Sequence, residues 1–250
     1  TDKSAPSLVS KYTLGQLLTR IERKGDLLFV ADFTRGIHIF DIKDRNNPVH
    51  LLKDESCNNL CITNFVLTGD LMVVNSVYDY HDDYSKITVE DISCIDSITV
   101  LAEIYVNAGI NDFAVVNDTL VACAVATCNR DGLWLLDLNP SNMIGIIKYQ
   151  TSGWRNAICY TAPKLFASDK YIHEYRLCPK NGLAKIDSLE TPDYLTDFTY
   201  SDKFMFTTGY YGSGIAYSVI PSPTLGIGEK TTVDGKKIAQ RMCSERFFTM

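Results

Sequence analysis

The segment "DYHDDYS" at residues 79–85 holds the densest group of side chains that could do chemistry. Carboxylates such as those of Asp82 and Asp83, next to the imidazole of His81, can bind a divalent cation or transfer protons. The segment lacks the glycine and distal glutamate of a calcium-binding EF-hand loop. We therefore assign no catalytic residue and no metal ligand, and we expect binding through the tyrosines. The tyrosines in and beside the segment are Tyr78, Tyr80 and Tyr84.

Two further segments, "SGWRN" (152–156) and "TGYYGSG" (208–214), combine aromatic rings with an arginine. The rings of Trp154, Tyr210 and Tyr211 could form a floor for a sugar or a peptide. The guanidinium of Arg155 would then be available to a carboxylate of the ligand. Alternatively, Trp154 packs between neighbouring repeats. Both interpretations stay open.

Three aspartates, Asp41, Asp91 and Asp137, recur at one position of a repeated pattern. Carboxylates near a central axis are a catalytic feature of some glycosidases. A residue repeated in successive units more often caps a strand or a turn, because its side chain accepts bonds from nearby backbone N–H groups. We expect a structural role for all three, and the same for His38 and His173 at equivalent strand positions.

Motifs for cofactors and nucleophiles are absent from the sequence. There is no Gly-x-Ser-x-Gly, Walker loop or dinucleotide fingerprint, and the glycines of "GIGEK" lack the strand-to-helix context of a phosphate site. Cysteine pairs such as Cys57 and Cys61 do not have the double CxxC spacing of a zinc site. The sequence therefore predicts no cofactor and favours a protein that is not an enzyme.

The elements that must position these side chains are repeated short strands. "GIHIFDI" (36–42) is echoed by "KITVEDI" (86–92), "GLWLLDL" (132–138), "YIHEYRL" (171–177) and "GIAYSVI" (214–220). Another apolar segment precedes each copy, and turn residues such as Lys24-Gly25 and Thr68-Gly69 open several of these segments. Further apolar stretches lie on both sides. Each unit therefore contains four strands in about 40 to 50 residues, which is typical of a β-propeller blade.

We predict an all-β propeller that forms a single domain over residues 1–250. Its five full blades would span about 13–52, 58–106, 109–149, 155–189 and 193–228. The segment 236–250 aligns with the start of a unit and 6–12 with the close of one. A sixth blade shared between the termini would remove the open sheet edge.

Residues 6–49, which include "PSLV", "LLFVAD" and "GIHIFDI", resemble the LVIVD-type propeller repeat, a relative in shape of WD40 blades. Gly36, Gly132 and Gly214 keep the glycine of that repeat, whereas Lys86 and Tyr171 replace it. The resemblance implies a propeller and little about ligands, because such families mostly lack a common activity. The same strand pattern occurs in larger scaffolds, so the chain could be one ring of a longer protein.

Composition narrows the classes of partner and compartment. The chain is 46% apolar with a net charge of −6, which argues against a nucleic-acid-binding surface. No apolar run reaches the roughly 18 residues of a membrane span. Several of the eight cysteines, including Cys61, Cys123 and Cys159, lie in apolar stretches that indicate core packing. This favours a reducing, cytoplasmic compartment, and a secreted or cell-surface location stays open.

Antiparallel alternation places the loops after the second and fourth strands of each blade on one face, which we call the loop face. Its tyrosine, tryptophan and arginine residues are of the types enriched at binding hot spots. The candidate binding residues are Arg35, Tyr78, Tyr80, His81, Asp82, Asp83, Tyr84, Arg130, Trp154, Arg155, Tyr210 and Tyr211.

We therefore predict a binding module or scaffold that recognises a protein through the loop face. One alternative is a carbohydrate-binding or glycoside-hydrolysing propeller that uses Asp82 or Asp83 with His81. Another alternative is an extracellular adhesion protein.

Overall fold

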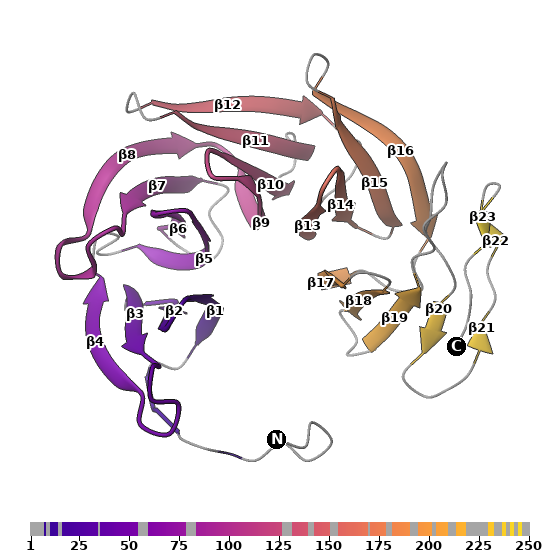
Figure 1. Cartoon of the computed structure of the whole chain (residues 1–250). Coiled ribbons are helices and arrows are strands. Elements are labelled where there is room, and N and C mark those ends of the chain that lie inside the picture. Colours follow the sequence, from indigo (N-terminus) through magenta and orange to yellow (C-terminus); the bar gives the residue numbers. More distant parts are fainter. Residues whose placement is uncertain are drawn as a thin grey trace. The chain divides into compact units, whose positions relative to one another are not determined.

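The chain folds almost entirely into antiparallel β-sheets, as a computed structural model shows (Figure 1). The structure describes residues 8, 11–14, 17–34, 36–54, 60–78, 84–126, 132–139, 143–150, 155–169, 171–178, 182–190, 195–201, 204–209, 214–218, 230–232, 237–238, 241–242 and 245–246. The only helical element in this part of the chain is the short 3-10 turn η1 (Ile95–Ser97). No helix among these residues is long and apolar enough to cross a membrane.

Four sheets contain four strands each, paired in chain order. The first comprises β1 (Leu18–Lys24), β2 (Leu27–Asp32), β3 (Gly36–Asp41) and β4 (Val49–Asp54). The second comprises β5 (Cys61–Thr68), β6 (Leu71–Val77), β7 (Ser85–Asp91) and β8 (Thr99–Val106). The third comprises β9 (Gly109–Asn117), β10 (Leu120–Ala126), β11 (Gly132–Asn139) and β12 (Met143–Gln150). The fourth comprises β13 (Ala157–Thr161), β14 (Lys164–Ser168), β15 (Tyr171–Cys178) and β16 (Gly182–Glu190).

The fifth sheet contains β17 (Leu195–Ser201), β18 (Phe204–Gly209), β19 (Gly214–Ser218), β20 (Lys230–Thr232) and β21 (Lys237–Ile238). Its third strand, β19, lies within the repeated segment predicted at 214–220 and confirms it as a strand. The other four copies of the repeated segment form β3, β7, β11 and β15, which are the third strands of their sheets. The sequence predicts that the fifth blade ends near residue 228, but residues 219–229 lie outside the described residues, and the strand that pairs with β19 is β20 at 230–232. β20 reads "KTT", a segment that carries no apolar pattern.

The segment 236–250, which the sequence assigns to a sixth blade, is described only in part. Residues 237–238 join the fifth sheet as β21, and β22 (Arg241–Met242) pairs with β23 (Glu245–Arg246) in a separate hairpin. In segment 6–12, the described residues Leu8, Lys11 and Tyr12 lie outside any strand. The sharing of one blade between the termini therefore stays a prediction.

Contacts divide the chain into two compact units. Unit 1 contains residues 1–107 and 140–144, and unit 2 contains 108–139 and 145–250. The prediction of a single domain over 1–250 is not tested by this division. We describe each unit by itself.

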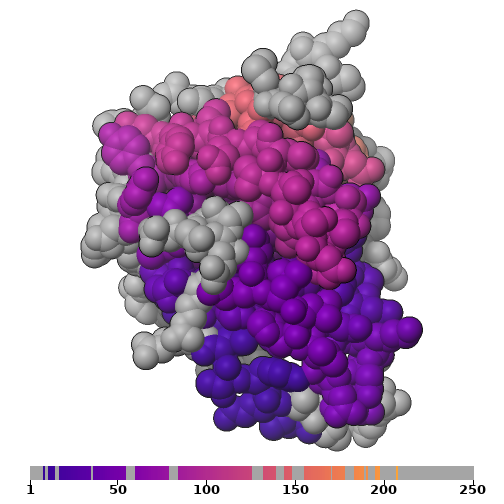
Figure 2. All heavy atoms as spheres, turned by 90° about the vertical axis from the view of Figure 1, so that its left-hand side faces the viewer, coloured from indigo at the N-terminus to yellow at the C-terminus, as the bar shows by residue number. Residues whose placement is uncertain are grey.

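In unit 1 the first two sheets pack face to face through a core of fully buried side chains. Phe29, Ala31 and Ile39 come from the first sheet, and Phe65 and Met72 come from the second. Because side chains alternate between the two faces of a strand, only one face of each sheet enters this core. The outer strands β4 and β8 leave apolar side chains exposed at the surface, and Figure 2 views unit 1 from the side on which these strands lie.

In unit 2 the third and fourth sheets share a second core. Ala122 and Leu133 of the third sheet meet Leu165 and Ala167 of the fourth. Cys123 is fully buried, as predicted for a core cysteine, and its burial, together with the charge of Asp112, raises the pKa of its thiol well above the ordinary value. Cys61, Cys94, Cys123 and Cys159 are free thiols in the described part of the chain.

Candidate functional site

One kind of backbone hydrogen bond joins successive sheets on the loop face at three described junctions. The N–H of Ile62 donates to the carbonyl of Phe33 at 2.9 Å, and Arg155 donates in the same way to Val125 at 3.4 Å. Leu195 donates to Asp169 at 3.3 Å. In each case the acceptor lies at the end of the second strand of one sheet or directly after it. The donor lies just before the first strand of the following sheet or near its start. Within each unit, this confirms that the two kinds of loop lie on one face.

The opposite ends of the sheets are closed by a second recurring bond. Ile42 donates to the carbonyl of Asp26 at 2.7 Å, and Ile92 donates to that of Asp70 at 2.8 Å. Leu138 donates to Thr119 at 2.7 Å in the third sheet. These bonds join the first and third turns of one sheet, so the two faces of each unit are built from different turns.

Asp41 and Asp91 serve these turns, as predicted. The Oδ1 atom of Asp41 accepts the N–H of Lys43 at 2.8 Å, and that of Asp91 accepts the N–H of Ser93 at 2.8 Å. Hydrogen bonds from the side chain and backbone of Ser93 hold the pKa of Asp91 below its ordinary value. Both carboxylates therefore cap the turn after a third strand.

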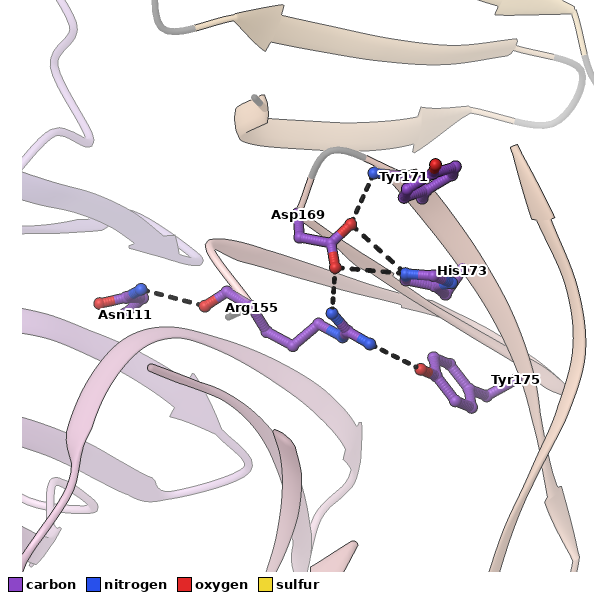
Figure 3. A network of polar contacts seen from close by, with 6 residues as sticks. All are labelled: Asn111, Arg155, Asp169, Tyr171, His173 and Tyr175. Carbon is purple, nitrogen blue, oxygen red and sulfur yellow. Dashed lines mark hydrogen bonds and ion pairs between the residues drawn. The ribbon is translucent and has the colours of Figure 1, made fainter. Parts of the chain in front are cut away.

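Arg155 of the loop face lies just before β13 and makes several polar contacts (Figure 3). Its side chain was expected to be open to a ligand carboxylate, but Arg155 is only 1% exposed. The guanidinium forms an ion pair with the carboxylate of Asp169 and lies 3.4 Å from the hydroxyl of Tyr175. Its carbonyl accepts the amide of Asn111 at 3.0 Å. The prediction of an open guanidinium was therefore wrong, because the chain supplies its own carboxylate.

Asp169, directly after β14, is the centre of this network. Its Oδ1 atom accepts the N–H of Tyr171 at 2.6 Å, and its Oδ2 atom lies 3.4 Å from Nε2 of His173. Burial alone raises the pKa of Asp169, but the bonds from His173 and Tyr171 and the charge of Arg155 bring it below its ordinary value. The carboxylate is therefore ionised near neutral pH and stabilises the guanidinium.

The same network ties neighbouring sheets to one another within unit 2. Asp112 of β9 accepts the N–H of Ile158 in β13 at 3.0 Å, while Asn111 binds the carbonyl of Arg155. The backbone carbonyl of Asp169 accepts from Leu195 at the start of β17. Three consecutive sheets are thus fastened at one edge, next to the ends of segments 151–154 and 191–194.

The exposed aromatic residues that the structure describes on the loop face of unit 1 are Tyr78 and Tyr84, at 64% and 58% exposure. They lie at the two ends of the segment that joins β6 to β7. Large aromatic side chains left in solvent at the end of a sheet are available to a partner. Nine predicted site residues lie outside the described residues, namely Arg35, Tyr80, His81, Asp82, Asp83, Arg130, Trp154, Tyr210 and Tyr211.

The described residues contain no group of three or more histidine, cysteine, aspartate or glutamate side chains that could hold a metal ion. Asp169 itself was missed by the sequence analysis. The only signal for it was its place directly after the second strand of the fourth sheet, a place that Phe33 holds in the first sheet. What the described arrangement does is hold loop ends in fixed positions.

No protein-family model matches the sequence, and no curated protein matches it. The solved structures that it resembles include the β-propeller domain of Myceliophteria thermophila Cps50 (Swd1), with a TM-score of 0.57 and 14% identity. That match covers 86% of this chain and 75% of the other. Sqt1 from Chaetomium thermophilum gives a TM-score of 0.59 and 10% identity, covering 85% of this chain and 57% of the other.

These similarities show the fold alone. Together with the four-stranded sheets they establish a β-propeller fold. They do not show the LVIVD-type repeat, which stays a resemblance of the sequence.

Proposed function

We propose that the chain is a non-enzymatic binding module that recognises a protein partner through its loop face. The β-propeller fold of its structural neighbours supports a binding module in general. The observation that carries the proposal is the recurring bond from Ile62, Arg155 and Leu195 to the preceding sheet. Because these bonds fix the backbone at the ends of β2, β10 and β14, they give the loop face fixed attachment points, which lowers the ordering cost of binding there.

The chemistry of the accessible residues favours a protein surface as the ligand. Tyr78 and Tyr84 offer large amphipathic rings, and tyrosine loses little conformational entropy when it is immobilised. The buried Arg155 and Asp169 act as support for the loops, because their charges are satisfied within the chain. The partner is therefore expected to contact aromatic side chains at the ends of the loops.

The test compares two faces of the same protein. The variant Tyr78→Ser/Tyr84→Ser removes both exposed rings of the loop face, and Arg45→Ser is its matched control in the exposed turn after β3. Chemical crosslinking of each protein in the source lysate, followed by mass spectrometry, identifies a partner. Calorimetry with the purified partner then gives affinities. We expect the double variant to bind at least about tenfold more weakly, a loss typical of hot-spot aromatic residues, and the control to bind like the wild type.

A partner that binds the double variant and the wild type equally, but loses affinity for Arg45→Ser, would place recognition on the opposite face. That result would overturn the proposal.

A further inference from the structure

The first sheet has a second face that does not enter the core of unit 1. Val30, Asp32 and His38 lie on it, because their neighbours Phe29, Ala31 and Ile39 point into the core. The strand register places Phe40 and His50 on this second face as well. The face therefore carries two histidines beside a buried carboxylate.

The two imidazoles touch one another across β3 and β4. Nδ1 of His38 lies 3.2 Å from Nε2 of His50, and the ring centroids are 5.2 Å apart. His38 is 8% exposed, whereas His50 is exposed. At this separation, one proton between the two nitrogens forms a hydrogen bond.

The charged groups around the pair can compensate only part of an added charge. On β2, Oδ2 of the buried Asp32 lies 3.9 Å from Nε2 of His38. On β4, Lys53 is the cross-strand neighbour of His38 and adds a positive charge. On β1, Arg23 shares this face and donates to the carbonyl of Gly25 at 2.7 Å. In the described part of this face, the carboxylate of Asp32 thus lies with two imidazoles and the cations of Lys53 and Arg23.

His50 also supports an aromatic stack. Its ring centroid lies 4.9 Å from that of Phe40, and the two rings are tilted. The ring of Tyr12 contacts Phe40 edge to face, with the centroids 5.1 Å apart. The hydroxyl of Tyr12 donates to the carbonyl of Pro48, just before β4. The segment around Tyr12 is therefore fastened to the same strand that carries His50.

We propose that the His38–His50 pair is a pH-sensitive fastening that holds β4, and the segment around Tyr12 with it, on the first sheet. A first proton strengthens the pair, because it makes a charge-assisted hydrogen bond and faces Asp32. A second proton places two cations about 3 Å apart, where their repulsion disfavours the closed arrangement. Histidine takes up such protons between about pH 5 and 8.

The sign of the effect follows from proton counting. Once the closed pair holds its one shared proton, further acidification favours the open arrangement, which can bind a second proton without repulsion. One extra proton bound on opening raises the opening equilibrium constant by up to about tenfold per pH unit. Opening would release β4 from β3 and uncover Phe40.

Hydrogen exchange on the full chain tests the proposal, with rates corrected for the intrinsic pH dependence of exchange. We expect the protection of peptide 49–54 to fall by up to about tenfold between pH 6 and pH 5. Peptide 99–106 is the internal control, because β8 is the outer strand of the second sheet and carries no histidine. In the His50→Gln variant, whose side chain keeps a hydrogen-bonding group but cannot be charged, the protection of 49–54 should lose this dependence.

A second variant keeps the test sharp. His173→Gln removes a histidine from the fourth sheet and should leave the pH response of 49–54 unchanged. Equal protection of 49–54 at pH 6 and pH 5, or a full pH response in His50→Gln, would overturn the proposal.

Discussion

Arg155 and Asp169 form a buried ion pair between the approach to β13 and the end of β14 (Figure 3). Their side chains are 2% and 15% exposed. Truncating one partner leaves the other charge without compensation in a desolvated place, which is more costly than the pair is worth. Loss of either Arg155 or Asp169 alone should therefore destabilise the loop face.

Asp169→Asn should lower the free energy of unfolding by about 3 kcal/mol, because it leaves the guanidinium buried without a counter-charge. Urea denaturation measures this loss. The matched control is the double variant Arg155→Met/Asp169→Asn, which should recover part of it. A loss below about 1 kcal/mol in Asp169→Asn would mean that the pair is not desolvated.

Asp169 also predicts an acid-dependent stability. Because its pKa is lowered in the folded protein, the ionised carboxylate contributes stability above the unfolded value of about 3.9, and this contribution is lost as the pH falls through the folded value. The wild type should therefore lose stability more steeply below about pH 4 than Asp169→Asn does. Thermal unfolding between pH 2.5 and 6 measures both curves. Parallel curves would contradict the assignment.

Gly36 and Gly25 form a matched pair for backbone strain. Both have positive φ, +95° and +59°, but a Cβ on Gly36 would overlap the carbonyl of Asp54, whereas a Cβ on Gly25 would meet open space. Gly25→Ala should cost about 1–2 kcal/mol from the left-handed backbone alone. Gly36→Ala should cost more, because β4 must also move. Equal losses in chemical denaturation would contradict the close approach of β4.

The core of unit 1 gives a contrast between buried and exposed apolar residues. Phe29 is fully buried between the first two sheets, whereas Leu51 is 46% exposed on the outer strand β4. Phe29→Ala should lower the free energy of unfolding by about 3–5 kcal/mol, and Leu51→Ala should change it by less than about 0.5 kcal/mol. Denaturant titration of both variants checks the prediction, and a large loss in Leu51→Ala would show that β4 is covered in solution.

Much of the fold could be predicted because the repeated apolar pattern lies in the most deeply buried strands. β3 and β11 carry apolar side chains on both faces, and β7 carries Ile87 and Val89 on one face, so their sequences resemble one another. β20 has no such side chains, so its position could not be read from hydrophobicity. Local patterns therefore predicted inner strands better than outer ones.

The site was less accessible to prediction than the fold. The pairing of Arg155 with Asp169 joins residues 14 positions apart on different segments, and no local spacing distinguishes it from an open arginine. The turn roles of Asp41 and Asp91 were predictable, because each bonds the backbone two residues further along. The sequence therefore predicted contacts within a turn, but it did not predict contacts between separate segments.

The most direct test of the central claim is a hydrogen-exchange footprint of the protein in complex with its purified partner. Binding through the loop face predicts increased protection in peptides around Tyr78, Tyr84 and Arg155. The two tyrosines flank the loop between β6 and β7, and Arg155 lies near the end of the loop between β12 and β13. The turn that contains Asp41 and Arg45, on the opposite face, should be unchanged. Protection confined to that turn, with no change around Tyr78 and Tyr84, would contradict recognition through the loop face.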